Sequence, residues 1–140
     1  MTANFHRCVV ILAAALSAAV LLSCATSNAN DDRVLTSISV TPLTADAQAF
    51  PNGQVTYTAT GSFSQPPLSA PVTFASPYNG YFVVDNPSSQ TIATIVATGT
   101  GTITVQCATG AVGDVQITAA AAVNNGTSTV VSGNAQLTCP

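Results

Sequence analysis

VTYTATGSFS, residues 55–64, places apolar or aromatic side chains at alternate positions and, for most of its length, hydroxyl side chains between them. Successive side chains of an extended chain point to opposite faces, so Val55, Tyr57 and Ala59 share one face. This period of two predicts a strand with one face in a hydrophobic core and the other in water. The stretch therefore indicates a β-sheet protein.

Similar composition continues on both sides of this stretch. From residue 35 onward Thr, Val, Ile and Ala dominate, and Gly, Pro and Asn recur at short intervals. Short runs separated by turn residues predict seven to nine strands in an all-β, immunoglobulin-like, two-sheet antiparallel sandwich, with no helix longer than a turn or two. The expected strands are 35–41, 55–64, 71–76, 81–84, 91–97, 102–108, 115–123 and 129–138.

The first expected strand, LTSISVT at 35–41, has Ile38 and Val40 on one face. Pro42 follows it directly and cannot donate a backbone hydrogen bond. Because proline is confined largely to edge strands, we expect this strand at the edge of its sheet.

The N-terminus has the pattern of an export signal. Arg7 is followed by an uncharged apolar run at 8–22. This run is shorter than the roughly 20 residues that a membrane-spanning helix needs, so a cleaved secretory signal is the better interpretation. Leu21-Leu22-Ser23-Cys24 resembles the lipobox of bacterial lipoproteins. The resemblance implies a signal peptide at 1–23 and acylation of Cys24 as the first mature residue.

Two processing routes remain open. Cleavage after Ala25 or Ala29 would instead release a soluble secreted protein. With acylation, Cys24 anchors the protein to a membrane of the bacterial cell envelope. Residues 24–33 are small and polar and predict a flexible tether, and residues 34–140 then form a single domain.

The composition of the domain excludes several classes of function. Its side chains include no Lys, Glu or His, and no Arg follows Arg33. Nucleic-acid binding needs cations, and nucleophilic Ser or Thr needs a neighbouring base, so neither is expected. We expect no enzyme, cofactor or metal site. The carboxylates available for a catalytic pair are Asp46, Asp85 and Asp114, which lie far apart in the sequence.

Several segments resemble the bacterial immunoglobulin-like domain, group 2. SISVTP at 37–42 is similar to the family's opening strand, and 55–64 to its second strand. IATI at 92–95 and GNAQL at 133–137 are similar to later strands. The resemblance implies an immunoglobulin-like fold that serves as a structural or adhesive module and contacts an envelope or surface protein.

The chain departs from the family pattern at two places. Phe74 stands where the family usually has Trp, and the link at 76–89 is longer than usual. Two segments match the penultimate strand, 101–105 and 113–119, and the spacing of the second fits the family better.

This assignment places the remaining cysteines. Cys107 and Cys139 would then end two strands that run toward the same end of the sandwich. A disulfide between them is expected in an exported protein. The alternative is two free, buried thiols.

Two further sites are possible in the stretch SPYNGYFVVDN at 76–86. Tyr78 and Tyr81 could stack on sugar rings and form a carbohydrate-binding module, or one of them could pack in the core while the other covers the turn. Asp85 and Asn86, with Asp114, could hold calcium through oxygen ligands, or form a solvated turn.

Overall fold

The computed structural model describes residues 33–72, 79–87, 89–123 and 128–140, which belong to one compact unit, Arg33–Pro140. The expected signal peptide at 1–23, the acylation site Cys24, and the aromatic residues Phe74 and Tyr78 lie outside the described residues. Within the described ranges, no helix has the length and apolar character needed to cross a membrane.

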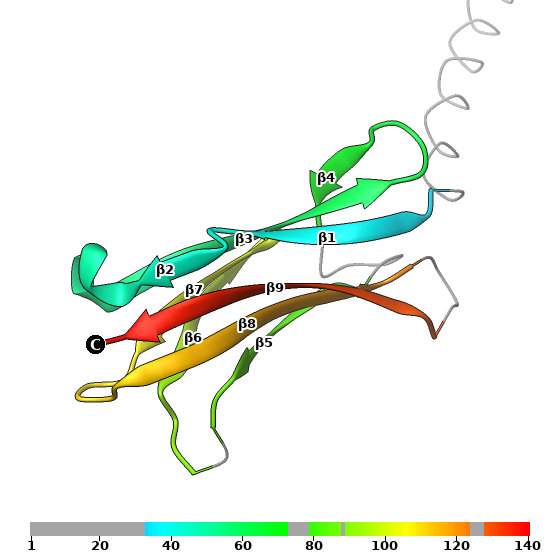
Figure 1. The fold of residues 1–140 in the computed structure, drawn as a ribbon. Helices are drawn as coiled ribbons and strands as arrows, with labels where there is room; N and C mark the ends of the chain where they lie inside the picture. Colours follow the sequence, from blue (N-terminus) through cyan, green and yellow to red (C-terminus); the bar gives the residue numbers. More distant parts are fainter. Residues whose placement is uncertain (1–32, 73–78, 88, 124–127) are drawn as a thin grey trace, which may run out of the picture. The chain divides into compact units, whose positions relative to one another are not determined.

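The described part of the chain is all-β, with nine strands and two 3-10 turns (Figure 1). The turns, η1 and η2, are Ala47–Ala49 and Pro51–Gly53. The strands are β1 (Leu35–Thr41), β2 (Thr44–Asp46), β3 (Gln54–Phe63), β4 (Ser69–Pro71), β5 (Tyr81–Asp85), β6 (Ala93–Gly99), β7 (Thr102–Cys107), β8 (Gly113–Ala122) and β9 (Val130–Cys139).

These strands form two sheets that pack as a sandwich. The first sheet has the order β1-β3-β7-β6, with β4 paired to β3, and the second has the order β2-β9-β8-β5. In Figure 1, β1 and β3 lie above β9, β8 and β5. The strand β1 is at the edge of its sheet, as Pro42 predicted, and β8 is the penultimate strand beside β9.

One expectation about the strands needs correction. The sandwich is not wholly antiparallel, because β2 runs parallel to β9. This strand has only three residues and no apolar alternation, so nothing in its sequence distinguished it from a loop. Of the third expected strand, 71–76, only Pro71 and Val72 are described: Pro71 ends β4 (Ser69–Pro71), Val72 is outside a strand, and residues 73–76 lie outside the described part.

Alternating strands supply the core from both sheets. The predicted inner face of β3 is fully buried, with Val55, Tyr57 and Ala59 at 0 % exposure. Leu137 of β9 and Ile117 of β8 are equally buried on the opposite sheet. The polar side chains between them point to solvent, which confirms the period of two.

The two sheets approach closely where β1 faces β9. A Cβ atom on Gly133 would collide with the backbone carbonyl of Ile38. Nearby, the Tyr57 hydroxyl donates a hydrogen bond of 3.1 Å to the backbone carbonyl of Gln136 and joins the two sheets. Burial raises the pKa of Tyr57 from 10.0 to about 12, because the ionised phenol would lose its water.

Arg33 belongs to the folded domain, whereas the sequence predicts it as the last residue of the tether. Its side chain is 6 % exposed, and its guanidinium lies 4.0 Å from the ring centre of Phe63. Nη1 also donates a hydrogen bond of 3.2 Å to the carbonyl of Pro67. This cation–π contact and hydrogen bond allow the cation to be buried, so packing begins one residue earlier than expected.

Candidate functional site

An open groove crosses the outer face of the second sheet. Its volume is about 730 Å³. Strands β2, β9, β8 and β5 form its floor, and the segments after β1 and β5 form its rims. The lining residues are Leu43, Thr44, Asp85, Asn86, Pro87, Asp114, Val115, Gln116, Asn134, Ala135 and Gln136.

Strand register builds the floor of the groove. Asp85 on β5 lies opposite Gln116 on β8, and Gln116 lies opposite Gln136 on β9. Thr44 on β2 pairs with Gln136 and completes a polar row across all four strands. Neighbouring strands are about 4.8 Å apart, so these side chains offer closely spaced donors and acceptors to one ligand.

The sheet also brings two carboxylates together. Asp114 lies two residues before Gln116 on β8, and so lies diagonally across from Asp85, a relation that places the Cβ atoms somewhat less than roughly 7–8 Å apart. Asp114 accepts a hydrogen bond of 2.6 Å from the Thr138 hydroxyl, and Asp85 one of 3.2 Å from the Thr118 hydroxyl. Both carboxylates are exposed and oriented by these hydroxyls, an arrangement that suits recognition through hydrogen bonds.

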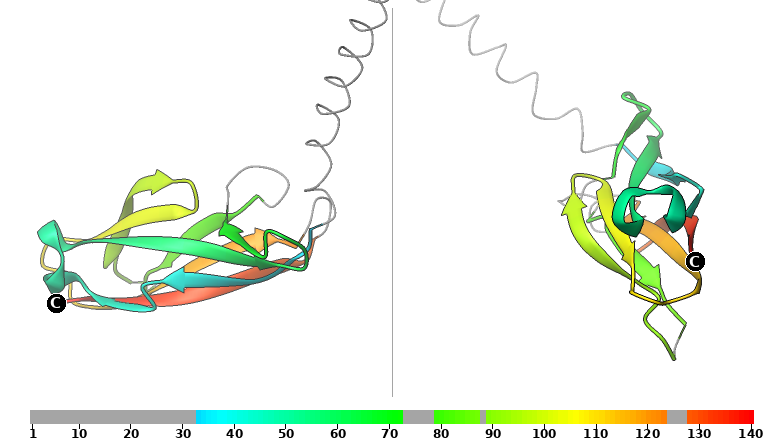
Figure 2. Two further views of the ribbon diagram at one scale, coloured as in Figure 1. Left: turned by 90° about the horizontal axis from the view of Figure 1, so that it is seen from above. Right: turned by 90° about the vertical axis from the view of Figure 1, so that its left-hand side faces the viewer.

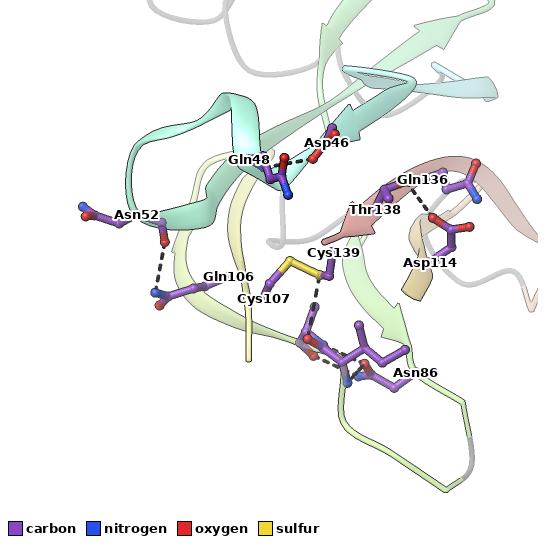
Figure 3. Close-up of a disulfide and its surroundings, with 12 residues drawn as sticks. Asp46, Gln48, Asn52, Asn86, Gln106, Cys107, Asp114, Gln136, Thr138 and Cys139 are labelled. Atoms are coloured by element: carbon purple, nitrogen blue, oxygen red, sulfur yellow. Dashed lines mark hydrogen bonds between the residues drawn. A yellow bond between two sulfur atoms is a disulfide. The ribbon is translucent and has the colours of Figure 1, made fainter. Parts of the chain in front are cut away.

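Asn86, which we considered as a calcium ligand, has a structural role. Its Oδ1 accepts hydrogen bonds of 2.8 Å from Ile92 N–H and 2.9 Å from Ala93 N–H. Its Nδ2 donates to the Ala93 carbonyl at 2.9 Å. Figure 3 shows this side chain turned toward the start of β6. The amide therefore fixes the connection between β5 and β6, and its oxygen is already engaged.

The structure places Cys107 and Cys139 in a disulfide, the pairing that the sequence analysis expected (Figure 3). Their Cα atoms are 5.8 Å apart, within the usual range for such a bond. Cys107 ends β7 in one sheet and Cys139 ends β9 in the other. The bond thus ties the two sheets together at one end of the sandwich, close to Asn86 and Asp114.

The two candidate tyrosines are only partly placed. Tyr81 begins β5, is 48 % exposed, and lies on the same outer face as the groove. It is four residues before Asp85, a rise of about 13 Å along the strand. Tyr78 lies outside the described residues, so the structure does not show whether the two rings form a pair.

The rest of the described side chains add no metal cluster. In the described ranges, no group of three or more His, Cys, Asp or Glu residues is arranged to hold a metal ion. The groove itself was not predicted, because its side chains come from four strands of which only β8 and β9 follow each other in the sequence.

Comparison with known proteins identifies no relative: no protein-family model, no curated protein and no solved structure matches this chain.

Proposed function

We propose that the chain is a non-enzymatic lipoprotein of the bacterial cell envelope, exported and anchored to a membrane through acylated Cys24. The apolar run at 8–22 and the lipobox-like residues 21–24 support the anchor. In this proposal the sandwich is an immunoglobulin-like domain of the bacterial group 2 type. Its role is to hold an envelope or surface protein, as a structural or adhesive module.

The polar row in the groove carries the binding proposal, together with the free edge beside it. Among the strands described, β5 is the last of its sheet and pairs with β8 alone. Tyr81 and Val83 on this strand are 48 % and 38 % exposed. A partner strand can pair with such an edge through backbone hydrogen bonds, while adjacent side chains supply specificity. Asp85 and Gln116 lie beside this edge and would supply the specificity.

The groove favours a protein partner over a glycan. Leu43, 69 % exposed, and the exposed Pro87 flank a floor of amides and carboxylates. No aromatic ring occurs among the described residues that line the groove. Apolar contacts beside hydrogen-bonding groups are typical of protein interfaces, whereas Tyr and Trp rings stacked on sugars are the usual feature of glycan sites.

Tyr81 supports a glycan as the second candidate. Its half-exposed ring lies on the same sheet face as Gln116 and Asn134. Amide and carboxylate groups can hydrogen-bond to sugar hydroxyls, and a ring outside the groove but farther along the same sheet face could stack on a sugar.

Position-specific crosslinking tests the proposal. A photoreactive amino acid replaces Gln116 in the full chain, expressed in its own bacterium. The matched control carries the same residue at Thr56, which is exposed on the outer face of the first sheet. We expect a protease-sensitive adduct from position 116 and none from position 56. Adding Gln136→Arg to the same chain should abolish the adduct, because its long cationic side chain fills the neighbouring position of the row.

The other outcomes are equally informative. A protease-resistant, glycosidase-sensitive adduct that disappears with Tyr81→Ala would replace the protein partner with a glycan. Equal adducts from positions 116 and 56, or none from either, would contradict the proposal that this groove binds a partner.

A further inference from the structure

An unpaired strand edge usually carries some feature that stops another strand from adding to it. In the described part of the chain, five strands have such an edge: β1, β4 and β6 in the first sheet, and β2 and β5 in the second. Strands β2 and β4 have only three residues each. Strands β1 and β6 each contain a register shift. Short strands and bulges both protect an edge, so four of these five edges are protected.

Strand β5 lacks these features. Its five residues, Tyr81–Asp85, pair with β8 in continuous register and include no proline. Tyr81 and Val83 are 48 % and 38 % exposed on its outer face. Phe82 and Val84 pack against the core from its inner face but are only partly buried. Of the edges described, β5 is therefore the one most open to another strand.

The side chains of β5 decide which strand fits beside it. Phe82 and Val84 need apolar neighbours, because the inner face belongs to the core. On the outer face, Val83 needs an apolar neighbour, Asp85 a hydrogen-bond donor and Tyr81 a hydrogen-bond acceptor. A fitting strand is therefore apolar at its three central positions and polar at both ends.

A second copy of β5 meets all of these conditions. When two copies pair antiparallel about Val83, each Val83 faces the other, and Phe82 faces Val84 of the second copy. At both ends of the pair Tyr81 faces Asp85, so the phenol can donate a hydrogen bond to the carboxylate. The two Asp85 carboxylates then lie about 13 Å apart along the strands, beyond the Debye length of roughly 8–10 Å, and repel each other little.

We propose that β5 pairs antiparallel with β5 of a second copy of this chain, so that two four-stranded sheets join into one sheet. This inference rests on the proposed function, in which a partner strand adds to β5, and names that strand. The contact is isologous, because both copies use the same surface and the pair closes on itself. Five residues from each copy make a small interface, so we expect a weak and reversible pair.

The antiparallel arrangement also sets the direction of the two chains. Figure 2 (left) shows the start of β1 and the C-terminus at opposite ends of the domain. Because the two copies run in opposite directions, their chains enter the pair from opposite ends. This arrangement suits the proposed adhesive role, in which a module joins two surfaces.

Cysteine crosslinking tests the pairing in the full chain, expressed in its own bacterium. Val83→Cys places two thiols opposite each other at the centre of the pair, with Cβ atoms roughly 4.5–5.5 Å apart, within reach of a short bis-maleimide reagent. The matched control is Ile95→Cys on the bulged edge strand β6, because Ile95 is also 38 % exposed. We expect a product of twice the chain mass from Val83→Cys and none from Ile95→Cys.

Two changes at Tyr81 give the test a sign. Tyr81→Lys places an ammonium group opposite Asp85 at both ends of the pair, and should raise the dimer yield from Val83→Cys several-fold. Tyr81→Asp places two carboxylates opposite each other at both ends, and should lower the yield several-fold. A general loss of folding would not produce opposite effects at one exposed position.

The remaining outcomes separate this inference from the proposed function. An adduct from position 116 to a different protein, without a dimer from Val83→Cys, would overturn the self-pairing and leave the proposed function intact. Equal dimer yields from Val83→Cys and Ile95→Cys, or equal responses to the two changes at Tyr81, would also overturn the self-pairing. No adduct from position 116 and no dimer from Val83→Cys would contradict both.

Discussion

Replacing both Cys107 and Cys139 with alanine should lower the free energy of unfolding by about 3.5–4 kcal/mol. The cysteines are 32 residues apart in the sequence, and the bond removes the entropy that this loop would have in the unfolded chain. Cys139 is 1 % exposed, so alanine is preferred to serine, which would bury a hydroxyl. The loss is large relative to the 5–15 kcal/mol that is typical of whole domains.

Urea denaturation measures this loss when the mature chain with its disulfide is compared with the double-alanine variant. Chemical reduction of the unaltered chain is the control and should lower stability by a similar amount. At low denaturant, where the double-alanine variant is still folded, the photoreactive residue at position 116 should still form its adduct, since the disulfide has a structural role. A loss below about 1 kcal/mol would contradict the assigned role and indicate that the sheets are held together at this end by other contacts.

Raising the pH from 10 to 12 should lower the free energy of unfolding by about 2 kcal/mol through Tyr57 alone. Its pKa is about 12 in the folded protein against 10.0 for the free side chain. Below pH 10 the phenol is protonated in both the folded and the unfolded chain, so its full contribution to the free energy of unfolding is present. Between the two values the unfolded chain loses the proton and the folded chain keeps it, and stability falls.

The composition makes this measurement unusually clean. The domain has no lysine, and its two cysteines are joined, so neither an ammonium group nor a free thiol of the domain contributes to this slope. Tyr57→Phe should remove most of the slope and cost about 1 kcal/mol at neutral pH, for the lost hydrogen bond to Gln136. An unchanged slope in Tyr57→Phe would show that Tyr57 is not the source.

The sequence was most informative where one face of a strand is buried. The inward positions of β1 and β3 were predicted correctly because a period of two has only one register that buries Ile38 and Val40, or Val55 and Tyr57. Alternation of this kind depends on local chain geometry and burial, both of which can be read from neighbouring residues.

Apart from the disulfide, several features that depend on tertiary pairing were not predicted. Strand β2 forms only because Thr44 to Asp46 lie alongside β9, far away in the sequence. The sequence left Asn86 open as a calcium ligand or as part of a solvated turn, because nothing local shows that its amide binds the backbone of Ile92 and Ala93. The groove row of Asp85, Gln116 and Gln136 likewise exists only once β5, β8 and β9 are in register.

The nearly uncharged surface raises the question of how edge strands avoid pairing with each other. Strand β6, at the end of the first sheet, has neither charge nor proline, and it exposes Ile95 and Val96. A register shift between Ile95 and Ala97 marks a β-bulge in this strand. Because a bulge bends and twists an edge, it hinders the addition of another strand there. Strand β5 pairs with β8 without such a shift, which fits its proposed role in binding.

The central claim is that this domain is held at a membrane by an acylated Cys24, and the intact mass of the chain purified from its own bacterial membranes tests it most directly. We predict a chain that begins at Cys24, lacks residues 1–23, and carries acyl chains on its N-terminal cysteine. The Cys24→Ser variant should lose both the added mass and the membrane association. An unmodified chain that begins after Ala25 or Ala29 and is recovered from the soluble fraction would contradict the account.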